Sequence, residues 1–205
     1  MHQEHLSRDR KLQRIMTASL EEITPKPNVA LRLIGSIMSQ QLSVRVAQVL
    51  YQRFLDIYKG KQPTARQILA TPPETLRAIG LSNAKVAYVH NVARFVVEEK
   101  LTDKKLHAMT DNEVIDYLTR IKGVGRWTVE MLLMFYLGRE DVFALDDLGL
   151  QQAMIKLYKL DVSDKKALRE KIRKISAKWS PYRTYAARYL WAWKDGGKKA
   201  NTPDV

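Results

Sequence analysis

Cysteine is absent from this chain of 205 residues, and histidine occurs only four times. Without cysteine there are no disulfide bonds, no thiol nucleophile and no cysteine-ligated zinc or iron–sulfur cluster. Four histidines also leave little material for a histidine-rich metal site. The longest apolar run, at 129–137, is far shorter than the ~20 residues that a membrane-spanning helix needs.

Acidic residues are the scarcer charged class, with 22 Asp or Glu against 35 Lys or Arg and a net charge of +13. A surplus of this size indicates a polyanionic partner such as nucleic acid or an anionic membrane surface. The surplus is uneven, because residues 164–199 contain 12 Lys or Arg and 3 Asp or Glu. Residues 1–14 are charged and contain no apolar stretch, so we expect no secretory signal and a cytoplasmic protein, nucleoid-associated if prokaryotic.

Alternating strand patterns are also missing, and apolar residues recur at helical spacing nearly everywhere. Ser43 is a good N-cap for a helix whose apolar face contains Val46, Ala47, Leu50 and Phe54. The segments that begin at Thr71 and Thr110 both have the spacing of a capping box. Further helices are predicted at 126–137, 164–178 and 182–194. The sequence therefore predicts an all-α protein of about ten short helices.

The segment Ile121-Lys122-Gly123-Val124-Gly125-Arg126-Trp127-Thr128 joins two of these helices. Two glycines around one small apolar residue make a tight hairpin, whose backbone can approach another backbone or a phosphate closely. The N–H groups and the positive dipole end of the next helix favour an anion at the same place. A tight helix–helix turn without a ligand is the alternative, and this segment alone does not decide between them.

An acidic pair follows an apolar segment in Val142-Phe143-Ala144-Leu145-Asp146-Asp147-Leu148. The simplest role for Asp147 is to cap the helix that begins there. Two adjacent carboxylates after a buried run are more than a cap requires. One of them can cap the helix while the other faces a cavity.

Together these segments resemble the helix-hairpin-helix and Gly/Pro/Asp-loop signature of base-excision DNA glycosylases. Within that group, the chain most resembles DNA-3-methyladenine glycosylase II. Three segments carry this more specific resemblance: Ser39-Gln40-Gln41-Leu42-Ser43, Gly125-Arg126-Trp127-Thr128 and Trp179-Ser180-Pro181-Tyr182-Arg183-Thr184-Tyr185-Ala186. It covers residues 30 to 193. The chain lacks the N-terminal β-rich domain of the longer bacterial enzymes and the cysteine cluster that some relatives use for an iron–sulfur centre.

The resemblance implies that Asp147 is the catalytic residue. It would stabilise the oxocarbenium-like sugar while the N-glycosidic bond breaks, and help to position or deprotonate water. Lyase-competent relatives have a lysine two residues after the second hairpin glycine, where this chain has Trp127. An indole forms no Schiff base, so the resemblance implies a monofunctional glycosylase without strand cleavage.

Aromatic faces attract the cationic ring of an N-alkylated purine. Trp127 and Tyr182 are therefore candidates for the base pocket, with Met131 one helical turn after Trp127. Ordinary core packing is the alternative for both aromatic residues. The family's intercalating wedge falls on Gln41 with Leu42 beside it, and the alternative is a polar turn with Leu42 in the core.

The hairpin supplies the remaining predicted contacts. We expect DNA phosphates to be bound by Gly123, Gly125, Arg126 and Thr128. The family's hairpin also binds a monovalent cation, Na⁺ or K⁺, through main-chain carbonyls, here those of Thr119, Ile121 and Val124. No other cofactor is expected.

We expect one glycosylase domain over 1–205, made of a helical lobe at 30–145 and a second lobe from 1–29 plus 146–195. The active-site cleft would lie between the lobes, and 196–205 would be a frayed tail. The leading hypothesis is a monomer that flips alkylated bases out of duplex DNA and hydrolyses their N-glycosidic bonds in base-excision repair.

Three alternatives remain. A glycosylase for oxidised or mismatched bases is disfavoured by Trp127 and by the lack of cysteine. A non-catalytic helix-hairpin-helix DNA-binding protein has no need of a carboxylate such as Asp147 facing DNA. A membrane-surface protein is the weakest alternative, because no helix combines strong amphipathicity with a lysine-rimmed aromatic face.

Overall fold

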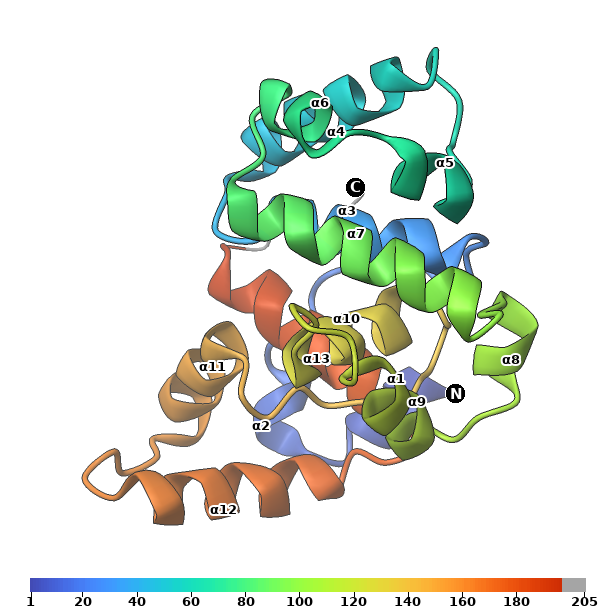
Figure 1. The fold of residues 1–205 in the computed structure, drawn as a ribbon. Helices are drawn as coiled ribbons and strands as arrows, with labels where there is room; N and C mark the ends of the chain where they lie inside the picture. The colour runs from blue at the N-terminus through green and yellow to red at the C-terminus, as the bar shows by residue number, and fades with distance from the viewer. Residues whose placement is uncertain (197–205) are drawn as a thin grey trace. The chain divides into compact units, whose positions relative to one another are not determined.

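The computed structural model describes residues 1–196, so the predicted tail lies outside the described residues except for Gly196. The described chain is helical and contains no strand, which confirms the all-α prediction (Figure 1). Its thirteen helices are α1 (His2–Leu6), α2 (Arg10–Gln13), α3 (Val29–Ser39), α4 (Val44–Ile57), α5 (Ala65–Ala70), α6 (Pro73–Ala78), α7 (Asn83–Glu98), α8 (Asp103–His107), α9 (Asp111–Leu118), α10 (Arg126–Phe135), α11 (Leu148–Tyr158), α12 (Lys165–Ala177) and α13 (Arg183–Lys194).

The chain divides into two compact units. The first unit combines the N-terminal segment Met1–Thr24 with the described residues from Leu133 onward. The second is the continuous segment Pro25–Leu132. Each unit is described by itself below. The lobe boundaries predicted from the sequence, and the cleft predicted between the lobes, stay predictions.

In the second unit, α3 packs against α4 and α7, and α7 also contacts α5 and α6. Helix α3 begins at Val29, directly after its N-cap Asn28, whose side chain accepts the N–H of Leu31. The Asp103 carboxylate accepts the N–H groups of Asn28 and Val29 at 2.7 and 3.0 Å. Leu33 and Ile37 of α3 are fully buried, as is Phe54 of α4. Local capping therefore starts α3, and burial of its apolar face holds it in place.

Two sequence-based details of this unit are wrong. Val46 was placed on the buried face of α4, but its side chain is 50% exposed, because only Ala47, Leu50 and Phe54 point inward. Thr71 does not cap a helix start. Its hydroxyl donates to the Gln67 carbonyl oxygen at the end of α5. The capping box of this region instead joins Thr64 and Gln67.

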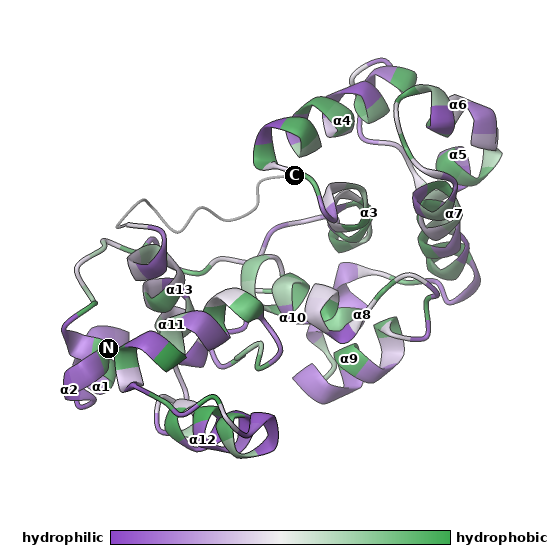
Figure 2. Cartoon of the chain, turned by 90° about the vertical axis from the view of Figure 1, so that its left-hand side faces the viewer, coloured by the Kyte–Doolittle hydropathy of each residue, from purple (hydrophilic) through white to green (hydrophobic). Residues whose placement is uncertain are grey.

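In the first unit, α13 packs against α11, and α11 also contacts α2. Leu6 and Leu12, from the short N-terminal helices, are fully buried, as are Trp179 and Tyr189 near the other end of the chain. Along α12, Figure 2 shows purple and green side by side, as expected for an amphipathic helix with one buried face. The N-terminal segment is therefore part of this unit's core.

No helix within residues 1–196 is both long and apolar enough to span a membrane.

Candidate active site

The hairpin between α9 and α10 needs glycine at position 123. Gly123 has a φ of +106°, and a Cβ added there would lie only 2.3 Å from Cγ of Tyr88. L-residues rarely adopt that conformation, and the tyrosine ring already occupies the space. This glycine is thus explained by packing inside the protein.

Gly125 differs from Gly123 in its surroundings. A Cβ added at Gly125 would meet no atom within 4 Å, and the residue is exposed. Its carbonyl oxygen accepts the N–H of Val129 at 3.2 Å, which begins the hydrogen-bonding ladder of α10. The first turn of α10 therefore starts beside an open backbone surface, where a phosphate can approach closely.

The side chains of the first turn of α10 are unequal. The Arg126 guanidinium is exposed and donates to Oε1 of Glu130 at 2.9 Å, which orients it. Thr128 is only 4% exposed. Arg126 is therefore available to a phosphate, whereas Thr128 is buried and its phosphate contact stays a prediction.

The two pocket candidates on α10 also differ. Trp127 is 45% exposed, so the core-packing alternative does not describe it. Met131, one turn further on, is buried. The exposed part of the Trp127 ring is open to contact with a ligand. Both residues stay predicted members of the base pocket.

Asp147 lies at the start of α11 and has two well-defined donors to one oxygen. Its Oδ1 accepts the N–H of Leu150 at 2.7 Å and the indole Nε1–H of Trp191 at 3.0 Å. The first bond is the N-cap that the sequence predicted, and the second comes from α13. Asp146 instead pairs with Arg169 at the surface. The neighbouring carboxylates thus have separate environments: Asp146 pairs with a cation at the surface, and Asp147 accepts uncharged donors from α11 and α13.

Gly149 permits the contact between Asp147 and Trp191. A Cβ at Gly149 would lie 3.0 Å from Oδ1 of Asp147 and 3.3 Å from Nε1 of Trp191. Any side chain there would crowd the two groups, so the glycine belongs to the local construction of the site.

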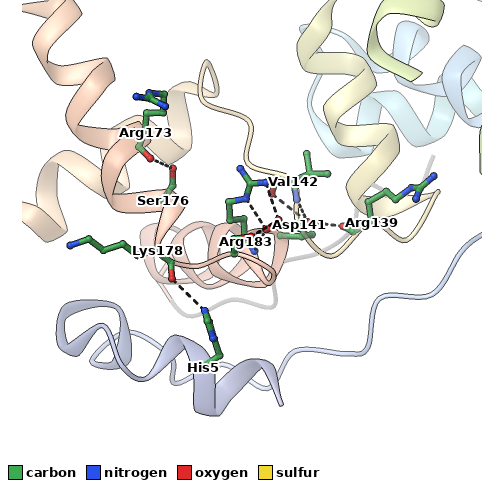
Figure 3. A network of polar contacts seen from close by, with 10 residues as sticks. His5, Arg139, Asp141, Val142, Arg173, Ser176, Lys178 and Arg183 are labelled. Carbon is green, nitrogen blue, oxygen red and sulfur yellow. Dashed lines mark hydrogen bonds and ion pairs between the residues drawn. The ribbon is translucent and has the colours of Figure 1, made fainter. Parts of the chain in front are cut away.

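The loop that leads to Asp147 is held by residues at the start of α13, where Arg183 faces Asp141 (Figure 3). Arg183 donates to both carboxylate oxygens of Asp141, at 2.7 and 2.9 Å, and the Ser180 hydroxyl adds a third bond at 2.7 Å. Thr184 accepts the N–H of Val142 at 3.0 Å and donates to the carbonyl of Arg139 at 2.7 Å. This part of the 179–186 motif therefore anchors the loop before Asp147.

These bonds also set the ionisation of Asp141. Partial burial opposes the charged form of the carboxyl, but the bonds from Arg183 and Ser180 outweigh burial and hold its pKa below the ordinary value. The loop is therefore held by an ionised carboxylate at neutral pH.

Tyr182, the third pocket candidate, packs among aromatic side chains of its own unit. Its ring lies edge-on to the rings of His2, His5 and Tyr185, with centroids 5.6 to 6.4 Å apart. His2 in turn stacks on Tyr185 at 3.9 Å. The packing alternative thus accounts for the contacts of Tyr182, and its place in the base pocket stays a prediction.

The predicted wedge lies in an exposed turn. Gln41 is exposed with a φ of +61°, and Leu42 is 38% exposed, so Leu42 is not a core residue. The Lys85 ammonium of α7 donates to the carbonyl oxygens of Met38 and Gln40, at 2.9 and 2.7 Å. Burial lowers the pKa of Lys85. Lys85 thus caps the end of α3 and fixes the turn from which Gln41 and Leu42 project.

The sequence did not single out Trp191, Gly149 or Lys85. Trp191 is 44 residues from Asp147, and Lys85 is 45 residues from Gln40, so no local pattern links either pair. A glycine in the first turn of a helix, two residues after the acidic pair, was the one local signal for Gly149.

The family model described as HhH-GPD superfamily base excision DNA repair protein matches residues 34–178. The chain belongs to the HhH-GPD superfamily. A DNA-3-methyladenine glycosylase 1 of Schizosaccharomyces pombe is 37% identical to it over 161 residues, which cover 78% of this chain and 69% of that protein. A putative DNA-3-methyladenine glycosylase of Bacillus subtilis is 35% identical, covering 78% of this chain and 56% of that protein.

Solved structures show the same fold. The structure of the S. pombe 3-methyladenine DNA glycosylase Mag1 in complex with abasic DNA matches with a TM-score of 0.81 and 31% identity, over 95% of this chain and 96% of that chain. A DNA-3-methyladenine glycosidase of Bacillus halodurans matches with a TM-score of 0.80 and 33% identity, over 97% and 91%. The HhH-GPD fold predicted from the motifs is therefore confirmed.

The described part of this HhH-GPD chain holds no group of three or more His, Asp or Glu side chains arranged for a metal ion. The predicted cation site uses main-chain carbonyls instead. Of those three, the carbonyl of Ile121 accepts the N–H of Val124 at 3.0 Å, and Thr119 follows the last residue of α9. The donor set is neutral oxygen, which suits Na⁺ or K⁺.

Proposed function

We propose that this HhH-GPD protein is a monofunctional DNA glycosylase that removes alkylated bases, with 3-methyladenine and 7-methylguanine as substrates, from duplex DNA in base-excision repair. The observation that carries the proposal is Asp147, a carboxylate oriented by two donors at the start of α11. The names of the similar proteins from S. pombe and B. subtilis agree with this chemistry.

Asp147 would act on the sugar. As the C1′–N bond breaks, its electron pair leaves with the base and positive charge develops on the sugar ring. A carboxylate held in place stabilises that charge without having to reorganise. Water then attacks C1′ and gives up a proton, to Asp147 or to solvent. The Leu150 and Trp191 donors keep Oδ1 fixed while this happens.

The base needs little help to leave. N-alkylated purines carry a positive charge that is lost when the bond breaks, so protonation of the leaving group is unnecessary. An aromatic ring attracts such a cation by roughly 0.5–2 kcal/mol. The exposed indole of Trp127 can serve this purpose, with Tyr182 and Met131 as further predicted pocket residues. An indole in place of the lyase lysine supports the monofunctional reaction.

The base must leave the duplex first, which requires a few kcal/mol. Gln41 and Leu42, which project from the turn fixed by Lys85, would fill the gap in the stack. Gly123, Gly125, Arg126 and Thr128 would hold the backbone phosphates, with a monovalent cation on the carbonyls of Thr119, Ile121 and Val124. We further propose that the protein acts as a monomer in the cytoplasm, or on the nucleoid in a prokaryote.

The test is to incubate the protein with methylated duplex DNA and to quantify free 3-methyladenine and 7-methylguanine. Asp147→Asn keeps the N-cap and removes the charge, so we expect excision to fall at least ~10²-fold while DNA binding is retained. Asp146→Asn is the matched control and should keep full activity. Strand breaks should appear only after alkali treatment.

Release of neither base, with salt-sensitive DNA binding by both wild type and Asp147→Asn, would refute the hypothesis that the protein is an enzyme. It would favour a non-catalytic helix-hairpin-helix DNA-binding protein. Release of oxidised or mismatched bases instead would redirect the substrate assignment and leave the role of Asp147 in place.

A further inference from the structure

A cavity of about 520 Å³ lies in the first unit. The residues that line it have no part in the excision mechanism proposed for Asp147. It is formed by the N-terminal helices, the end of α11 and the end of α12, and it is lined by His5, Arg8, Asp9, Arg10, Lys11, Tyr158, Ile175, Lys178 and Trp179. We call it the basic cavity. Its volume is that of an ordinary ligand site.

Four permanent cations line the basic cavity, from Arg8, Arg10, Lys11 and Lys178. All four side chains are exposed, and within residues 1–196 none of them forms an ion pair with a carboxylate. Lys11 has uncharged partners in Tyr158, since its ammonium donates to the Tyr158 carbonyl oxygen at 3.5 Å and lies 5.2 Å from the centre of the Tyr158 ring. An anion that enters the cavity would find charge that the protein itself has left unneutralised.

Asp9 is the one carboxylate in the cavity, and its hydrogen-bonding capacity is occupied. Oδ1 accepts the N–H groups of Lys11 and Leu12, at 3.0 and 3.2 Å. Oδ2 accepts the Tyr158 hydroxyl at 2.6 Å and the Trp179 indole N–H at 3.2 Å. Asp9 therefore holds the cavity floor together, and its single negative charge leaves an excess of three positive charges among the described residues that line the cavity.

The positive charge continues from the cavity along α12. Lys171, Lys174 and Lys178 follow one another at spacings of three and four residues, so they share a face with Ile175, which lines the cavity. Lys174 also pairs with Glu170 at 3.8 Å, an exposed contact that salt screens. Figure 3 shows His5 pointing at the main chain of Lys178, where its Nε2 donates to the carbonyl oxygen at 3.3 Å. The end of α12 is thereby attached to the N-terminal helices.

The extent of this surface indicates the ligand. Lys171, Lys174 and Lys178 span about 10 Å along α12 and its C-cap, which corresponds to about three successive phosphates of one DNA strand. A small free anion would require the cavity alone and not a row of lysines that leads to it. We infer that the basic cavity and the lysine face of α12 bind the phosphodiester backbone of nucleic acid, at a contact separate from the hairpin.

The inference rests on charge and shape and does not need excision chemistry, so its test uses undamaged duplex DNA. Arg8→Gln with Lys178→Gln removes two exposed cations and keeps the main-chain carbonyl that His5 uses. Each phosphate contact contributes about 0.9 to the slope of log K against log salt concentration. We expect the slope, measured by fluorescence anisotropy, to fall by about 2 in magnitude.

Arg66→Gln with Lys104→Gln is the matched control, since both cations are exposed on the second unit, outside the cavity. The single-turnover excision rate at saturating methylated DNA should stay at the wild-type value in both double variants. If the wild-type protein excised no base, the proposed glycosylase activity would be refuted, but the salt slopes would still test the DNA contact. Equal slopes for wild type and the Arg8/Lys178 variant would overturn the inference.

The indole N–H of Trp179 gives a direct readout, because it donates to Asp9 inside the cavity. We expect its ¹⁵N–¹H resonance to move when duplex DNA is added, and to move much less in the Arg8/Lys178 variant. Inorganic phosphate is the second probe. A shift with phosphate alone, combined with unchanged DNA slopes, would assign the cavity to small anions and would overturn the nucleic-acid assignment.

Discussion

The Trp191 indole holds the Asp147 carboxylate through a single hydrogen bond, which one substitution can remove. Trp191→Phe removes the donor to Oδ1 of Asp147 and keeps most of the ring volume. A hydrogen bond to a charged group contributes roughly 1.5–3 kcal/mol, so we expect the single-turnover excision rate to fall roughly 10–100-fold. Affinity for undamaged duplex DNA should not change.

Trp193→Phe is the control for that substitution. Its ring lies under the Lys156 ammonium at 5.0 Å and does not contact Asp147 in the described structure. A similar loss of excision in both variants would mean that α13 had been disturbed as a whole, and the positioning role of Trp191 would then be withdrawn.

The ionised carboxylate of Asp141 makes the stability of the fold depend on pH. Its folded-state pKa lies below the ordinary value, so its stabilising contribution is present above about pH 4 and is lost as the pH falls through the folded pKa. Asp141→Asn should lower the melting temperature at pH 7 by a few degrees. Once the pH has fallen below the folded-state pKa of Asp141, the two proteins should melt together. A difference that persists at low pH would mean that packing and not charge is responsible.

Local chemistry made Asp147 predictable and left its partners hidden. An aspartate after an apolar run and before a helix is a recognisable N-cap, and the structure shows that bond. The Trp191 donor arrives from a helix that begins 36 residues later, so only tertiary packing defines it. The exposure of Trp127 was likewise invisible in the sequence, where an aromatic residue is equally compatible with the core.

At the scale of elements, the two hairpin glycines should respond oppositely to alanine. Gly123→Ala forces a strained φ and a clash with Tyr88, so we expect a loss of roughly 2 kcal/mol or more in the free energy of unfolding. Gly125→Ala meets no protein atom and should melt like the wild type. It should nevertheless weaken duplex binding several-fold, because the methyl group occupies the approach of a phosphate.

Thermal melts of the two glycine variants measure the stability, and titrations with duplex DNA measure the affinity. If Gly125→Ala bound DNA as tightly as the wild type, the open side of the hairpin would have no role in phosphate contact.

The turn between α3 and α4 depends on Lys85. Lys85→Met leaves the carbonyls of Met38 and Gln40 without their ammonium donor, and we expect the unfolding free energy to fall by about 1–2 kcal/mol. Base flipping, followed by 2-aminopurine fluorescence beside a lesion, should weaken more than duplex binding does. Lys104→Met, on the exposed face of α8, is the control. Normal flipping by Lys85→Met would show that the turn holds its shape without the lysine.

Helices were predictable where caps are local and strong. Ser43 and Thr110 both cap the helices that the sequence predicts after them. The failures have equally local causes. Val46 is four residues from Leu50, so periodicity alone placed it on the buried face. Thr71 has the right spacing to Glu74, but the end of α5 already uses its hydroxyl.

At the scale of the whole molecule, the first unit is assembled from both ends of the chain, and its core needs the N-terminal segment. Leu6, Leu12 and Ile15 are buried there, and Asp9 bonds to Tyr158 and Trp179. Burial of three aliphatic side chains, at 2–5 kcal/mol each, is comparable to the whole stability of a typical domain. Deletion of residues 1–18 should therefore abolish soluble, folded protein.

Leu12→Ala gives the graded version of the truncation. We expect a soluble protein with a melting temperature lower by roughly 5–15 °C. A truncated protein that melts like the full chain would show that the N-terminal helices are dispensable. The predicted lobe of 1–29 plus 146–195 joins this segment to the C-terminal helices, but its buried contacts could not be located from the sequence. The segment is short and rich in charge, and Asp9 finds its partners Tyr158 and Trp179 more than a hundred residues away.

The cap that Asp147 provides has a consequence for how this chain can diverge. Asparagine, serine and threonine cap a helix about as well as aspartate does. A single base change that converts Asp147 to asparagine can therefore end base excision, while α11, the hairpin, the basic cavity and the lysine face of α12 persist. Descendants of such a gene would still find and cover DNA, and selection could keep them for that property alone.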